Sequence, residues 1–470
     1  MSETDERVRS LIDEATRLRY SRRGVIKRGA ALGVSTAGIA AALGASGHQV
    51  SARSAARLQS GGKLTILAGS YFVPEAQEFF VSQVNDWGSQ NNFEVQTDFV
   101  NWPDIQAKIS AAVESGAGPD VVELRETWPY LYYEQMVDLN AMALKIGEAG
   151  GGFYDWATNT AAVDGNYYSI PVGTSSIAMA YRISHLEAAG LTGAADAANF
   201  PKTWDELFAL GKNLKAMGKP LGQALGQSTG DPPGFAYPYM WSYGAMEVDA
   251  EGNVAFNTPE FVDGMQKFIQ GWKDGFDETG LSWDDSANNR AFLSDQISAT
   301  LNGSSVYLTA QKNAAGTDTG LDYDVVVDPA DINHAGLPGG PAGRFCALGS
   351  WSYGVMKYSQ NAEAGARLLD WWLSPENYTA WLEAQKGYII PSSASYASNP
   401  VFTTDPKLAP YLDVVNYGRN KGFAGPANQN AARVSSQYIV TNTFAKAIES
   451  GDAKAAIDEG ARLLERIYNR

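Results

Sequence analysis

The feature that most constrains this chain is an alternation of strand-like and helix-like segments that begins after residue 62. Residues 63–68, 93–100 and 120–124 are short apolar runs typical of strands. Between the first two, Phe80, Val84 and Trp87 recur at the i, i+4, i+7 spacing of a buried helical stripe. Strands that alternate with helices favour an α/β architecture with parallel sheets.

Helix start signals extend the alternation through the rest of the chain. Thr203 and Glu206 form a capping box, in which the threonine accepts from the helix backbone and the glutamate reaches back. Proline follows Thr258 and Ser374, a position where its missing N–H costs nothing. A last amphipathic helix is predicted over residues 452–468.

Length and charge narrow the class of protein. The chain has 470 residues, more than one hydrophobic core usually supports, so two domains or lobes are expected. Residues 1–60 hold ten basic and five acidic side chains, so the remainder holds 26 basic against 47 acidic. A surface of that sign repels nucleic acid and anionic lipid, and neither is an expected partner.

The N-terminal segment resembles a twin-arginine signal peptide. Arg22 and Arg23 are followed by Lys27, and residues 29–52 form an uncharged run rich in Ala and Gly. Small and weakly apolar residues make that run a poor permanent membrane anchor. We therefore expect residues 1–58 to be a leader that is removed or unfolded, and the protein to work in the periplasm or at the cell surface.

Residues for catalysis or metal binding are scarce. Beyond the leader the chain has only two histidines, His185 and His334, and its single cysteine is Cys346. These residues assemble neither a zinc site nor a disulfide, and phosphate-loop, dinucleotide and nucleophile-elbow motifs are absent from the sequence. We expect no cofactor and no metal. A glycosidase that uses Glu123 and Glu126 stays possible, because paired acids leave no local signature.

Aromatic residues in expected loops point instead to binding. The chain has 12 Trp and 23 Tyr, and several fall outside the helical stripes: Trp102, Trp128, Trp241, Tyr243 and Trp351. A flat indole face matches the C–H face of a pyranose ring, and nearby polar groups can satisfy its hydroxyls. As a set, these residues favour a carbohydrate site.

Several motifs together resemble the extracellular solute-binding proteins of ABC importers, in the maltose-binding-like group that takes sugars. They are Gly118-Pro119-Asp120-Val121-Val122, Val137-Asp138-Leu139, Asp164-Gly165-Asn166-Tyr167-Tyr168-Ser169-Ile170-Pro171, Pro201-Lys202-Thr203-Trp204-Asp205-Glu206-Leu207, Ala299-Thr300-Leu301-Asn302-Gly303-Ser304 and Gly387-Tyr388-Ile389-Ile390-Pro391. The resemblance covers nearly all of residues 62–470.

The resemblance implies two α/β lobes joined by crossing segments, with the ligand held in the cleft between them. It places residues 62–170 and 306–345 in lobe 1, and residues 171–305 and 346–470 in lobe 2. Together with the aromatic set, the ligand-contacting residues that it implies are Ser70, Tyr71, Phe72, Trp102, Glu123, Glu126, Trp128, Trp241, Tyr243, Asn302, Ser304, Trp351 and Tyr438. Where some sugar binders carry an aromatic after the Asn-Gly pair, this chain has Ser304-Ser305, so the identity of the sugar does not carry over.

The function implied is that of a receptor that performs no chemistry. It would bind an oligosaccharide or glycoside by lobe closure and deliver it, as a monomer, to the membrane subunits of an ABC permease. Two alternatives stay open. A polyamine or other cation receptor would use carboxylates such as Glu123 and Glu126, and a secreted carbohydrate-active enzyme would turn its glycan over.

Overall fold

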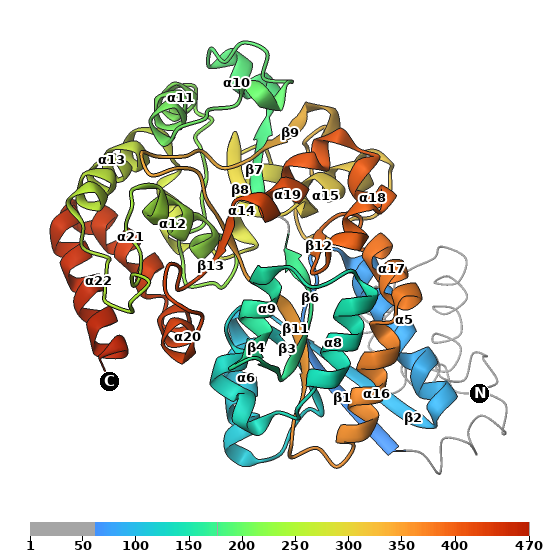
Figure 1. Cartoon of the computed structure of the whole chain (residues 1–470). Helices are drawn as coiled ribbons and strands as arrows, with labels where there is room; N and C mark the ends of the chain where they lie inside the picture. Colours follow the sequence, from blue (N-terminus) through green and yellow to red (C-terminus); the bar gives the residue numbers. More distant parts are fainter. Residues whose placement is uncertain (1–61, 176, 470) are drawn as a thin grey trace, which may run out of the picture. The chain divides into compact units, whose positions relative to one another are not determined.

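The computed structural model describes residues 62–175 and 177–469, which form two lobes of helices and sheet (Figure 1). The sheet of lobe 1 has six strands in the spatial order β12 (Ile389–Pro391), β6 (Ser169–Ser175), β11 (Trp351–Val355), β3 (Val121–Arg125), β1 (Gly62–Gly69) and β2 (Phe93–Val100). Strand β1 is parallel to β2 and β3, whereas β11 is antiparallel to β3 and β6. The carboxyl ends of β1 and β3 therefore meet at one edge of this sheet.

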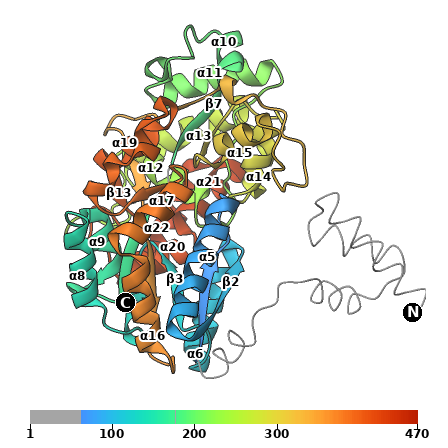
Figure 2. The ribbon, with the colours of Figure 1, turned by 90° about the vertical axis from the view of Figure 1, so that its right-hand side faces the viewer.

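Helices cover both faces of the first sheet. On one face lie α5 (Pro74–Asn91), α16 (Ala362–Trp372) and α17 (Pro375–Ala384), side by side in Figure 2. On the other lie α6 (Trp102–Ser115) and α9 (Asp155–Ala161) (Figure 1), and α8 (Asn140–Ala149) and the short α7 (Pro129–Tyr132) complete the lobe. Phe80, Val84 and Trp87 of α5 are buried, as their spacing predicted.

Lobe 2 is built around a smaller sheet of three strands, in the order β8 (Ala299–Asn302), β7 (Ala178–Arg182) and β9 (Ile332–Ala335). Its helices include α10 (Ile183–Ala188), α11 (Trp204–Ala216), α12 (Asp231–Ser242), α13 (Pro259–Gly275), α14 (Ala287–Leu293), α15 (Ser305–Ala314), α18 (Pro400–Thr403), α19 (Ala409–Asp413), α20 (Gln429–Ser436), α21 (Ile439–Ser450) and α22 (Ala453–Tyr468). Strand β7 is antiparallel to both neighbours, so the expectation of parallel sheets is wrong for this lobe. Strand β7 pairs with β8, the next strand in the chain, and with β9, and both begin more than 100 residues after β7 ends.

The boundaries expected for the two lobes are also wrong. Residues 305–314 form α15, whose Val306, Tyr307 and Ala310 pack with Ala178 and Ala180 of β7, so this segment belongs to lobe 2. Residues 351–391 belong to lobe 1, because β11 inserts between β3 and β6. The chain thus crosses near Ser175–Ala178, returns between β10 (Cys346–Leu348) and β11, and crosses again after β12.

Local signals placed several elements correctly. The strand predicted at 93–100 is β2. The capping box is present at α11, where the Thr203 Oγ1 accepts from the Glu206 N–H at 3.2 Å and the Glu206 Oε2 accepts from the Thr203 N–H at 3.1 Å. The helices predicted after Thr258 and Ser374 are α13 and α17. The helix-start signals act within four residues, which is why sequence alone reveals them.

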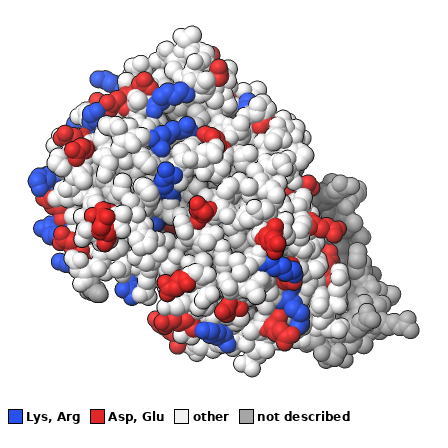
Figure 3. Space-filling view, viewed as in Figure 1, with Lys and Arg blue, Asp and Glu red and all other residues white. Residues whose placement is uncertain are grey.

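Four further points concern the single cysteine, the surface, membrane crossing and the leader. Cys346 is buried and unpaired, and burial raises the pKa of its thiol to about 12. On the face shown in Figure 3, acidic and basic side chains are interspersed and form no continuous basic patch. Within the described residues, no helix combines the length and the apolar character that a bilayer crossing requires. The proposed twin-arginine signal lies outside the described residues.

Candidate functional site

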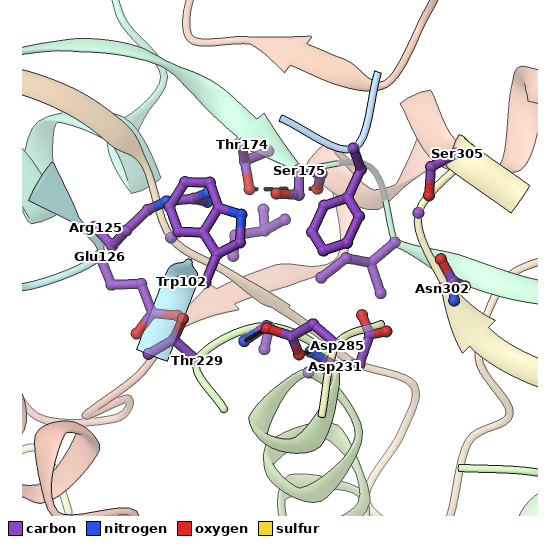
Figure 4. Close-up of a pocket in the computed structure, with 18 of the residues that line it drawn as sticks. Trp102, Arg125, Glu126, Thr174, Ser175, Thr229, Asp231, Asp285, Asn302 and Ser305 are labelled. Carbon is purple, nitrogen blue, oxygen red and sulfur yellow. Dashed lines mark hydrogen bonds between the residues drawn. The ribbon is translucent and has the colours of Figure 1, made fainter. Parts of the chain in front are cut away.

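A cavity of about 770 Å³, including its opening to solvent, lies between the two lobes. Its lining includes Phe72, Trp102, Arg125 and Glu126 from lobe 1, and Asp231, Asp285 and Asn302 from lobe 2 (Figure 4). Phe72 follows β1, and Arg125 and Glu126 lie at the end of β3. Ligand sites of open α/β sheets gather at these carboxyl ends, because the loops that follow them converge there.

Two tryptophans hold Arg125 in place. Its Cζ atom lies 3.3 Å from the ring centroid of Trp102 and 3.6 Å from that of Trp351, and the two tilted indoles are themselves 5.3 Å apart, so the guanidinium rests against both rings. Each indole is anchored in turn: the Trp102 Nε1 donates to the Ser70 carbonyl at 2.7 Å, and the Trp351 Nε1 donates to the Ser175 Oγ at 3.0 Å. Stacking of this kind fixes the cation and both aromatic planes.

Glu123 lies behind this stack and balances its charge. Its Oε1 is 3.2 Å from the Arg125 Nε, and its Oε2 accepts from the Tyr353 hydroxyl at 3.1 Å and the Gly69 N–H at 3.2 Å. Burial raises the pKa of Glu123 to about 7, although the Arg125 charge lowers it in part. The side chain is fully buried and contributes to positioning the cavity wall rather than to its surface.

Two carboxyl groups of lobe 2 face the cavity together. The Asp285 carboxylate accepts from the Asp231 N–H at 2.8 Å, the Gly230 N–H at 3.2 Å and the Ser228 hydroxyl, and so caps the start of α12. The Asp231 Oδ2 accepts from the Asn288 amide at 2.7 Å. Burial, and for Asp231 the neighbouring Asp285 charge, raise the pKa of both groups. We call Asp231 and Asp285 the acid pair.

Glu126 connects the lobes. Its carboxylate pairs with the ammonium of Lys421, which is buried on the lobe 2 side, and accepts from the Ser435 hydroxyl of α20 at 3.1 Å. Glu126 has a φ of 50°, a backbone conformation that favours glycine. We call the contact between Glu126 and Lys421 the interlobe ion pair. It stabilises the arrangement in which the two sides of the cavity approach one another.

Comparison with known proteins identifies the family to which this two-lobed chain belongs. Residues 82–410 match the family described as bacterial extracellular solute-binding protein. The chain belongs to this family. The match confirms the family predicted from the sequence motifs, and with it a receptor that works outside the cytoplasm.

Solved structures share the fold. Maltose-bound MalE3 of T. maritima is 21% identical, with a TM-score of 0.72 over 87% of this chain and 100% of that one. A solute-binding protein of Thermotoga lettingae bound with α-D-tagatose is 17% identical, with a TM-score of 0.73 over 87% and 100%. The GacH receptor of Streptomyces glaucescens, solved unliganded and with acarbose, is 17% identical, with a TM-score of 0.70 over 87% and 99%. They confirm the predicted two-lobe α/β fold.

Part of the predicted contact set does line the cavity of this solute-binding protein. Phe72, Trp102, Glu126 and Asn302 are in its wall. Ser70 and Tyr71 line a neighbouring hollow that shares Phe72 and Trp102 with the main cavity. The loop after β1 and the end of β3, which the sequence proposed as ligand contacts, thus lie at the candidate cavity.

Other predicted contacts lie elsewhere. Four tryptophan or tyrosine side chains proposed as ligand contacts are buried or displaced from the cavity lining: Trp128, Trp241, Tyr243 and Tyr438. Trp241 packs edge-on to Tyr237 inside the core of lobe 2, and Trp351 lies behind Arg125. Ser304 is buried between the lining residues Gly303 and Ser305. Packing with distant parts of the chain, which the sequence does not reveal, keeps these side chains out of the cavity lining.

Sequence reasoning missed the acid pair, Arg125 as an individual residue, and Lys421. One signal was available for Asp231: it opens the run Asp231-Pro232-Pro233, and prolines in a first turn mark the start of a helix. Nothing local marks Asp285 or Lys421, whose partners lie 54 and 295 residues away.

Proposed function

We propose that this protein captures a carbohydrate in the interlobe cavity and delivers it to the membrane subunits of an ABC permease. The observation that carries the proposal is the make-up of the cavity. Lobe 1 contributes the aromatic surfaces of Phe72 and Trp102, while lobe 2 contributes the carboxyl and amide groups of Asp231, Asp285 and Asn302. An apolar wall opposite a few polar groups suits a sugar ring, which is apolar on its faces and polar at its edge.

Lobe closure is the mechanism that this arrangement supports. A ligand that touches both walls favours the closed state through contacts absent from the open one. The interlobe ion pair would add to closure, since it joins the same two lobes. The permease would then recognise the closed form of a monomeric receptor, exported by the twin-arginine route before it binds its ligand.

Two observations favour binding over turnover. Glu123 is fully buried behind Arg125 and accepts a hydrogen bond from the Tyr353 hydroxyl. Glu126 is held in the interlobe ion pair. A retaining glycosidase needs both of its carboxyl groups free to face one sugar bond. Glu123 and Glu126, the acids considered for a glycosidase, therefore do not fit that role, and we propose a receptor that performs no chemistry.

A binding screen on the chain from residue 62 tests the proposal. Melting temperatures would be measured with mono- and oligosaccharides, polyamines and phosphate, followed by calorimetry on the sugars that raise them. A ligand at a hundredfold over its dissociation constant adds about 2.7 kcal/mol of stability. A response to polyamines alone would overturn the carbohydrate proposal, and hydrolysis of a labelled glycan would overturn the absence of chemistry.

A further inference from the structure

The cavity wall holds more carboxyl groups than basic side chains. Each basic side chain in its wall already has a carboxylate partner: Arg125 pairs with Glu123, and Lys421 pairs with Glu126. Among the described residues, neither member of the acid pair makes an ion pair with a basic side chain, although each residue is only 9% exposed. The cavity therefore holds buried carboxyl groups in excess of its cations.

Local structure explains only one of these two carboxyl groups. Asp285 accepts two N–H groups and a hydroxyl at the start of α12, so it has a structural role as a cap. Asp231 receives a donor from the Asn288 amide, a contact that a neutral asparagine could also accept. Burying a carboxylate costs free energy unless a cation or several donors compensate it. The fold therefore gives no structural reason for a carboxyl group, in place of an amide, at position 231.

Aromatic surface lies in the same hollow. Phe72 and Trp102 line the main cavity together with Asp231 and Asp285, and both also line the neighbouring hollow with Asp285. Figure 4 shows Trp102, Asp231 and Asp285 around one open space. A protonated amine binds well where carboxylates and aromatic faces meet, through charge-assisted hydrogen bonds and cation–π contact.

We propose that the carbohydrate taken by this cavity carries a protonated amino group, and that Asp231 is the residue that selects it. The ligand class is an amino sugar, or an oligosaccharide with a free amine. This inference rests on the proposed function and narrows it. The sugar ring lies against the aromatic wall, and its ammonium group donates to the acid pair and supplies the missing positive charge.

Matched sugars test the proposal directly on the wild-type protein. Calorimetry would compare sugars that differ only in the group at C2, which is a free amine, an N-acetylated amine or a hydroxyl. The comparison would cover the gluco, galacto and manno monosaccharides and β-1,4-linked oligomers. At pH 6, where the amine is protonated, we expect the amine form of the preferred sugar to bind about tenfold tighter than its acetylated and hydroxyl forms. Equal or weaker binding of the amine form would overturn the inference and leave the carbohydrate receptor standing. Failure of all sugars, with binding of spermidine, would overturn the receptor proposal itself.

A pair of variants locates the selectivity. Asp231→Asn keeps the size of the side chain and its contact with Asn288, and should lower the ratio of amine to N-acetyl affinity to about one. Asp263→Asn removes the same charge from the exposed surface of α13 and should leave that ratio at its wild-type value. A ratio retained by Asp231→Asn would overturn the role of Asp231. Melting temperatures of both variants would establish that they are folded.

Discussion

Phe72→Ala offers the sharpest test of the aromatic wall. The ring lies in the loop between β1 and α5, is half-buried, and lines both the main cavity and the neighbouring hollow. A sugar that covers on the order of 50 Å² of its exposed surface gains about 1.2 kcal/mol at ~25 cal/mol per Å². Specific contact between ring and sugar adds to this, so we expect a loss of about 1 to 2 kcal/mol, or roughly five- to thirtyfold in affinity.

Phe79→Ala is the matched control. Phe79 is the same residue type, is also half-buried against the core of lobe 1, and lies on α5 outside the cavity lining. Calorimetry with the tightest sugar of the screen would give the affinities, and thermal melts would give the stabilities. We expect Phe79→Ala to lower the melting temperature without changing affinity by more than about twofold. If Phe72→Ala binds as tightly as wild type, the aromatic wall does not contact the ligand and the reasoning is refuted.

Four further predictions follow from the structure and the sequence. Trp241→Ala should cost about 3 to 5 kcal/mol of stability, because the indole is fully buried, and should leave sugar affinity within about twofold of wild type in calorimetry. A large loss of affinity at normal stability would instead place Trp241 in the site. Glu126→Gln removes the interlobe ion pair and should increase the radius of gyration of the ligand-free protein in small-angle scattering, while the sugar-saturated form stays at the wild-type value. Identical scattering without ligand would deny the pair a role in closure. Burial raises the pKa of Glu247 to about 7 from an unfolded value near 4.5, so this group favours the folded state at low pH, and up to about 3 kcal/mol of stability is lost as pH rises through 7. Glu247→Gln should therefore flatten the fall in melting temperature between pH 5 and 8, and a curve parallel to that of wild type would contradict the shift. Arg22→Lys with Arg23→Lys should leave full-length precursor in the cytoplasm in a fractionation blot, and normal export would exclude the twin-arginine route.

The stronger sequence predictions were those that depend on neighbours along the chain. The capping box at Thr203 and the proline after Thr258 each act within a single helical turn, and both helices begin where predicted. The buried stripe of α5 follows from the helical period alone. The order of the family motifs predicted a solute-binding receptor, and the family match over residues 82–410 confirms this prediction.

The aromatic residues show that sequence patterns do not distinguish a ligand contact from a core residue. Trp102 and Trp241 looked alike as tryptophans in expected loops, yet Trp102 lines the cavity while Trp241 is enclosed by the core of lobe 2. Trp351 was predicted to contact the ligand and instead stacks on Arg125 from behind. Indole supports core packing and ligand contact equally well, so residue type does not separate the two roles.

By itself, then, the sequence determined which segments form helices or strands, approximately where these begin and end, and the family of the protein. The tertiary structure alone decided which strands share a sheet, where the chain crosses between lobes, and which charges meet in the cavity. Asp285 caps a helix that begins 54 residues earlier, and Lys421 finds Glu126 across the lobes. Helix caps and periodicity depend on energies set within a turn or two, whereas these pairings depend on how distant surfaces pack, and packing has no signature at any one position.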